Sequence, residues 1–200
     1  MYSEIYEYRE QKLMRFFETF SYALLLFFGV DAVKSLGSII GVFHIFDSSD
    51  PIAISLSIVK SEREDMFSTF IVLFFLAWIF MALRLAYAQE EKRRRYYIAL
   101  PLLVVPIVNA FAIYYFIKEI WIGFFNKNKP VYIVILWWIM TLIATAFYII
   151  KNGLLAKLNE GNNFELFLYS HIGQHSFNIL AFILLSYIVV SLLNRRADNR

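Results

Sequence analysis

Long hydrophobic runs alternate with short polar stretches along the chain. Four runs are close to the length that crosses a bilayer, at residues 16–40, 67–88, 131–150 and 173–193. A transmembrane helix needs about 20 apolar residues to cross a hydrocarbon core of about 30 Å. The pattern therefore predicts an all-α, polytopic membrane protein with four transmembrane helices.

A further apolar stretch, at 98–125, is interrupted by helix-breaking and polar residues. It contains Pro101, Pro106 and Asn109. Each proline removes a backbone donor and clashes with the preceding turn, and the freed carbonyls need partners inside hydrocarbon. The stretch is therefore either a kinked helix buried against others or a broken interfacial or re-entrant segment. We favour the second interpretation, in which it does not cross the membrane.

The composition agrees with a membrane-embedded chain. Of its 200 residues, 60% are hydrophobic and 19% are aromatic, and none is cysteine. So much apolar side chain exceeds what a soluble domain of this size usually buries, so we expect one integral membrane domain over 1–200. The absence of cysteine excludes disulfides, thiolate metal sites and cysteine nucleophiles.

The distribution of basic residues predicts the topology, because Lys and Arg near helix ends collect on the cytoplasmic side. If 98–125 does not cross, fourteen basic residues lie on one side and four on the other; if it does cross, the split is eight against ten. The stronger bias favours four spans in a bacterial inner membrane, with both termini cytoplasmic. The fourteen are Arg9, Lys12, Arg15, Arg84, Lys92, Arg93, Arg94, Arg95, Lys118, Lys127, Lys129, Arg195, Arg196 and Arg200.

Four consecutive cations stand between the second span and the interrupted stretch. They are Lys92, Arg93, Arg94 and Arg95. Basic clusters beside a membrane attract anionic lipid, so we predict that this patch faces lipid and a cytoplasmic protein partner. Direct binding of nucleic acid is not expected, although a homo-oligomer is compatible with the pattern.

The first span contains a charged pair, Asp31 and Lys34, which are three residues apart and so share a helical face. If the helix ends near Val33, the pair marks the membrane boundary. If the helix continues to Ile45, the charges lie within the membrane and indicate a functional interior site. The polar residues that follow favour the boundary interpretation. Asn109 is a third possible intramembrane polar residue.

Three histidines are the best candidates for chemistry. His171 and His175 are four residues apart at the amphipathic start of the last helix, and His44 follows the first span. In the four-span topology all three lie on the outer side, and two imidazoles at this spacing can bind zinc or copper from one helix face. Interfacial histidines bonded to backbone or water are the simpler alternative, and pH sensing is a third. We therefore expect neither a resident metal nor a cofactor.

Common catalytic signatures are absent from the sequence. It has no G-x-x-x-x-G-K-[ST], G-x-G-x-x-G, H-E-x-x-H or G-x-S-x-G. We therefore predict that the protein is not an enzyme.

Two resemblances to known families add to this interpretation. The stretches W-I-F-M-A-L-R-L at 78–85, P-I-V-N-A-F-A-I-Y-Y-F-I-K-E-I-W at 106–121 and W-W at 137–138 resemble an uncharacterised family of bacterial four-helix membrane domains. The chain departs from that family at Ala112, where proline is expected. In size, span number, basic cytoplasmic ends and absence of an enzyme motif, it is also similar to the small four-helix membrane proteins of type VI-B CRISPR loci. Some of those proteins carry a nuclease-like motif with arginine four to six residues before histidine, which this chain lacks.

The second resemblance implies a regulatory function. We predict a non-enzymatic membrane accessory protein that modulates an RNA-guided antiviral effector. An oligomeric pore or channel is the alternative, and a metal-dependent membrane enzyme is a distant third.

Overall fold

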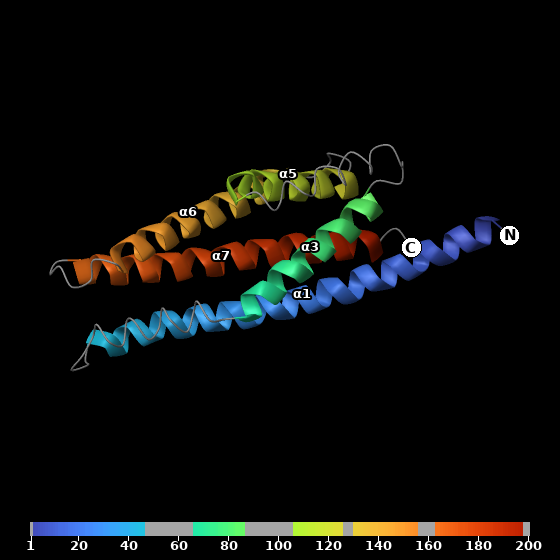
Figure 1. Ribbon diagram of the computed structural model, residues 1–200. Helices are drawn as coiled ribbons and strands as arrows, with labels where there is room; N and C mark the ends of the chain where they lie inside the picture. Colours follow the sequence, from blue (N-terminus) through green and yellow to red (C-terminus); the bar gives the residue numbers. More distant parts are fainter. Residues whose placement is uncertain (1, 47–65, 87–105, 126–129, 156–162, 198–200) are drawn as a thin grey trace. The chain divides into compact units, whose positions relative to one another are not determined.

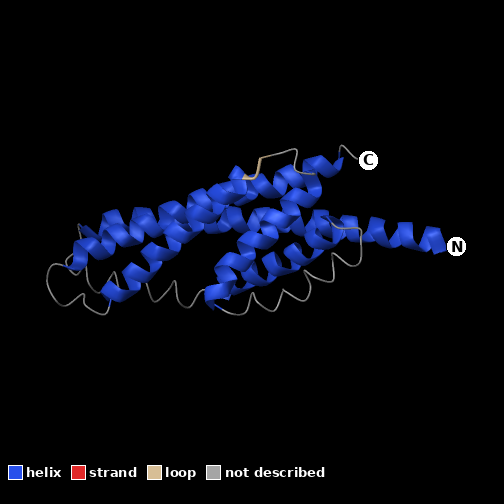
Figure 2. Ribbon diagram, turned by 90° about the horizontal axis from the view of Figure 1, so that it is seen from above, coloured by secondary structure: helices blue, strands red, loops and turns tan. Residues whose placement is uncertain are grey.

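Every regular element that the structure describes is an α-helix (Figures 1 and 2). The structure is a computed structural model that describes residues 2–46, 66–86, 106–125, 130–155 and 163–197. The prediction of an all-α protein is therefore confirmed for this part of the chain. The helices are α1 (Tyr2–Phe46), α3 (Met66–Ala86), α5 (Pro106–Phe125), α6 (Tyr132–Leu155) and α7 (Asn163–Ala197).

Three helices are long and apolar enough to cross a membrane. They are α1 over Gln11–Phe43, α6 over Tyr132–Leu155 and α7 over Asn163–Arg195. These helices indicate a membrane protein. In α3 the apolar part with described side chains, Ile71–Ala86, is shorter, so the fourth span at 67–88 stays a prediction.

Two predicted helix ends are wrong. Helix α1 continues without a break to Phe46, so it does not end near Val33. Helix α6 continues through Lys151 to Leu155, beyond the predicted end of the span at residue 150, although the sequence Lys-Asn-Gly at this point is typical of a turn. The Lys151 side chain is buried, and Asn152 Nδ2 donates to the Tyr148 carbonyl at 2.8 Å. These contacts stabilise a helical turn that the sequence signal alone disfavours.

Pro106 is the first residue of α5 rather than a break within a helix. Proline is favoured at the first helical position because its fixed φ suits the helix and its missing N–H has no intrahelical partner there. From this residue α5 runs unbroken to Phe125. The expected break in 98–125 therefore does not occur after Pro106, and residues 98–105 lie outside the described part.

The chain divides into two compact units. Unit 1 comprises Met1–Phe27, Phe70–Ile135 and Leu185–Arg200, and unit 2 comprises Phe28–Thr69 and Leu136–Leu184. Helices α1, α3, α6 and α7 each contribute residues to both units, whereas α5 belongs wholly to unit 1.

Aromatic side chains form much of the core of unit 1. The Phe17 ring stacks on Trp78 at a centroid distance of 5.9 Å and on Phe124 at 6.1 Å. A second contact, 5.2 Å between Phe20 and Phe74, also joins α1 to α3. Phe17 therefore brings α1, α3 and α5 together at one point.

In unit 2, α7 packs against both α1 and α6. Phe28 stacks on Phe182 at 5.7 Å, and Phe147 stacks on Phe177 at the same centroid distance. An apolar cluster near the N-terminal end of α7 adds further contacts. It is formed by Val42, Phe167 and Leu168, with Leu154, Leu155, Phe164 and Ile172 packed against it.

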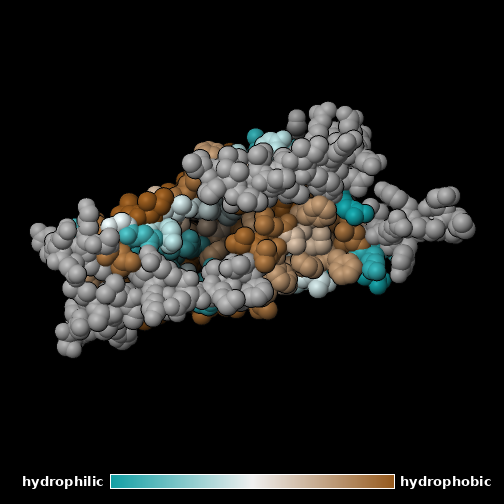
Figure 3. Space-filling view, viewed as in Figure 1, coloured by the Kyte–Doolittle hydropathy of each residue, from teal (hydrophilic) through white to brown (hydrophobic). Residues whose placement is uncertain are grey.

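Many large apolar side chains lie on the surface of the described helices. Leu26, Val33 and Phe43 of α1 are exposed, as is Ile149 of α6. Figure 3 shows part of this surface as brown patches on one face. Extended apolar surface of this kind is rare on soluble monomers and suits contact with lipid.

Candidate functional site

Among the side chains that the structure describes in unit 2, six polar ones are buried, and together we call them the polar layer. They come from three helices, with one residue on α1, one on α6 and four on α7. Their burial is unusual because polar groups inside apolar helices are costly and are commonly functional. The polar layer consists of Ser35, Lys151, Ser170, His171, Gln174 and His175.

The pairing of α1 with α7 brings Ser35 into this layer. On α1, Phe28, Ser35 and Val42 are buried at intervals of seven residues, so they share one face of the helix. Phe28 contacts Phe182, Ser35 contacts His175, and Val42 belongs to the cluster with Phe167 and Leu168. Within unit 2, Ser35 is therefore the polar residue between the apolar contacts of Phe28 and Val42.

The two histidines of α7 lie against each other. Their ring centroids are 4.5 Å apart with an interplanar angle of 61°. His175 Nδ1 lies 3.2 Å from Ser35 Oγ, a hydrogen bond that joins α7 to α1. His171 also lies against the Phe167 ring, with centroids 6.4 Å apart. The structure thus brings His171 and His175 together, as their spacing predicted.

Gln174 lies on the same turn of α7 as the two histidines. Its side chain is 9% exposed, and its Oε1 has no hydrogen-bond partner within the described structure. A buried acceptor in this state costs about 1–3 kcal/mol. The amide oxygen therefore has capacity for an additional donor or cation.

Lys151 is the cation of the polar layer. It is 1% exposed, and its Nζ lies 5.6 Å from the centroid of the Tyr148 ring, a cation–π contact within α6. Four residues earlier on the same helix, Phe147 packs so closely against Gly173 that a Cβ there would be 2.9 Å from the ring. Lys151 therefore belongs to the face of α6 that packs against α7.

The remaining predicted site residues are only partly described. Lys34 is exposed on α1 and Asp31 is half-buried, and both lie within the helix rather than at its end. His44 lies in α1 and Asn109 in α5, but their side chains are outside the described set. The basic patch Lys92–Arg95 lies outside the described residues altogether.

Sequence reasoning missed Ser35 and Lys151. The sequence contained a pattern that indicates the burial of Ser35, because Ser21, Phe28, Ser35 and Val42 follow one another at seven-residue intervals. All four are buried in the structure. Lys151 gave none, since a lysine before Asn-Gly usually indicates a solvated loop.

The chemistry available to the polar layer is hydrogen bonding and coordination. It contains imidazole nitrogens, hydroxyls, an amide and an ammonium group, but no carboxylate among its described members. Across the side chains that the structure describes, no group of three or more His, Asp or Glu is arranged to hold a metal ion. The layer therefore lacks a complete set of the usual metal ligands.

No family model, curated protein or solved structure matches the chain.

Proposed function

We propose that the protein is a non-enzymatic membrane accessory protein whose basic segments dock with a cytoplasmic protein partner. The observation that carries this proposal is the charge difference between the two units. The sequence ranges of unit 1 hold fourteen Lys and Arg against eight Asp and Glu, a net charge of +6. Those of unit 2 hold five against eight, a net charge of −3. Unit 1 is therefore the unit that the positive-inside rule assigns to the cytoplasm.

The order of the units along the chain supports the four-span topology on which this function depends. The chain passes between the units four times, with its boundaries at 27/28, 69/70, 135/136 and 184/185. Both termini therefore belong to unit 1. Helix α5 also lies wholly in unit 1, which supports the interpretation that the stretch 98–125 does not cross the membrane.

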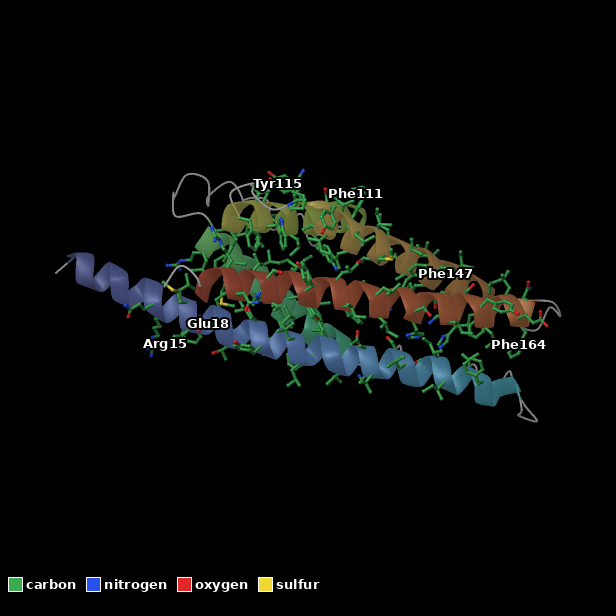
Figure 4. The ribbon with its side chains drawn as sticks, turned by 180° about the vertical axis from the view of Figure 1, so that it is seen from behind. Arg15, Glu18, Phe111, Tyr115, Phe147 and Phe164 are labelled. Carbon is green, nitrogen blue, oxygen red and sulfur yellow. The ribbon has the colours of Figure 1, made fainter. Side chains whose placement is uncertain are left out.

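Exposed charges at one end of α1 also suit docking. Lys12 and Arg15 are exposed in unit 1, and Figure 4 shows Arg15 and Glu18 projecting away from the ribbon of α1. Charged side chains on an exposed helix can steer a partner of complementary charge. On the CRISPR resemblance, that partner is an RNA-guided antiviral effector.

The proposal is tested by a phage-interference assay with the protein and such an effector in one cell. Replacing Lys92, Arg93, Arg94 and Arg95 with glutamine should abolish the change in phage titre that the wild-type protein produces. Lys60→Gln with Arg63→Gln, two basic residues of the unit 2 ranges, is the matched control and should act like wild type. A quadruple variant that keeps full activity at normal abundance would show that the patch only directs topology.

An oligomeric pore is a second candidate, and the polar layer favours it. Buried polar side chains in transmembrane helices commonly line ion or substrate pathways. Single-channel recording on purified protein separates the two functions. Steady unitary currents that change in selectivity when Asp31 is replaced with asparagine would replace the accessory function with the pore.

A further inference from the structure

We propose that unit 2 binds a transition-metal cation of the zinc class through His171 and His175, with Gln174 Oε1 as a third donor. This site is independent of the cytoplasmic docking function. It lies within the polar layer and takes its three donors from one turn of α7.

The two imidazoles have the spacing and closeness that such a cation requires. Histidines at positions i and i+4 present their rings on one helix face, as they do in helical zinc motifs. Two nitrogens on a tetrahedral zinc ion are about 3.3 Å apart, given Zn–N bonds of about 2.0–2.1 Å. Ring centroids separated by 4.5 Å allow that nitrogen separation with small rotations of the side chains.

Ser35 prepares His175 for coordination. When His175 Nδ1 carries the proton and donates to Ser35 Oγ across 3.2 Å, Nε2 keeps its lone pair. Metal-binding histidines commonly donate their second ring N–H to a neighbouring oxygen, which fixes the tautomer and orients the ring. Ser35 is thus a positioning residue that acts from α1 on a ligand of α7.

The buried side-chain oxygen of Gln174 favours the binding of a cation over the binding of an anion. Its Oε1 is buried and has no hydrogen-bond partner among the described residues. The lone pairs of this oxygen can therefore coordinate a metal ion. An anion would add a second acceptor beside it, whereas a metal cation would use the lone pair. Lys151 is the cation among the described members of the layer, and its ammonium contacts the Tyr148 ring.

The set of two nitrogens and one amide oxygen determines the type of site. Imidazole suits zinc, copper and nickel, while a neutral amide oxygen adds little charge. Three protein donors leave a coordination position for water, as in open zinc sites. We therefore expect reversible binding of one ion per chain rather than a structural metal that is required for folding.

The test uses full-length protein in detergent micelles, purified with a tag that contains no histidine. Zn²⁺ is titrated by calorimetry and, independently, in competition with a chromogenic chelator. Wild type should bind one ion, and His171→Ala or His175→Ala should lose this binding. Ser35→Ala should weaken it by about 10-fold to 100-fold, as removal of outer-shell partners usually does, and Gln174→Leu should weaken it as well.

Two matched controls keep the result specific. Thr145→Ala should bind like wild type, because the exposed Thr145 hydroxyl donates to the Thr141 carbonyl of its own helix and lies outside the polar layer. His44→Ala should also bind like wild type, because His44 is not in the proposed ligand set. Loss of binding in His44→Ala would overturn that set.

A second measurement guards against variants that fail to fold. Co²⁺ bound by wild type should give a visible absorption band that is absent in His171→Asn and His175→Asn, provided that each variant has a wild-type elution volume and circular dichroism spectrum. Absence of stoichiometric Zn²⁺ binding by folded wild type would overturn the proposal. So would equal binding by wild type and the folded histidine variants.

Discussion

The indole N–H of Trp78 donates a 2.8 Å hydrogen bond to the hydroxyl of Ser21, although the two residues are 57 positions apart in the chain. Both side chains are fully buried in unit 1. An indole N–H in an apolar interior needs an acceptor. This hydrogen bond therefore fixes α1 against α3.

We expect Ser21→Ala to lower the free energy of unfolding by about 1 kcal/mol, because it leaves the Trp78 N–H without its acceptor. The measurement is unfolding in mixed micelles by titration with a denaturing detergent. Thr145→Val is the control, since the Thr145 hydroxyl donates to the Thr141 carbonyl of its own helix at an exposed position. Equal midpoints for Ser21→Ala and this control would contradict a tertiary role for the bond.

Neighbouring phenylalanines on α1 test the packing of unit 1. Phe17→Ala removes a buried ring that stacks on Trp78 and Phe124, whereas Phe16 is 51% exposed. In lipid the stability of helix contacts comes from close packing, so we expect a loss of about 2 kcal/mol for Phe17→Ala. Phe16→Ala should change the same unfolding curve by less than about 0.5 kcal/mol. A larger effect at Phe16 would mean that α1 presents its other face to the core.

Helix α5 approaches α3 closely at Gly123. A Cβ at this position would lie 2.7 Å from the Ala86 Cβ, which is too close without movement of a helix. We expect Gly123→Ala to cost about 1–3 kcal/mol and Ala86→Gly in the same chain to restore part of the loss. Gly37→Ala is the control, because a Cβ there meets nothing within 4 Å. If Gly123→Ala is as stable as this control, α5 does not pack against α3 in this register.

Hydrophobic patterning predicted most of the helices, and the physical reason is length. Uninterrupted apolar runs such as 67–88 and 131–150 can satisfy their backbone only as helices, and α3 and α6 occupy these positions within a few residues. Patterning did not predict that α1 continues beyond Val33 or that α6 continues through Lys151. At both positions packing between helices decides where the helix ends. Ser35 lies beyond Val33 and bonds to His175 of α7, a partner 140 residues away that the local sequence does not reveal.

The candidate site could be predicted only in part. The spacing of His171 and His175 showed that they share a helix face, because four residues make about one turn. Their contact with α1 depends on which turn of α1 pairs with which turn of α7. That register follows from the stacking of Phe28 on Phe182 and the cluster around Val42. Neither is visible in the sequence of one helix alone.

The central claim is that the protein crosses the membrane four times and has its basic unit in the cytoplasm. The location of the two termini tests this claim most directly. Fluorescent-protein and alkaline phosphatase fusions after Arg200 report opposite sides of the membrane, and a fusion after Gly161 serves as the control. We predict fluorescence without phosphatase activity after Arg200, and phosphatase activity after Gly161. If only α1, α6 and α7 cross, the termini lie on opposite sides, because three passes are an odd number. Phosphatase activity after Arg200 with a cytoplasmic N-terminus would contradict the account.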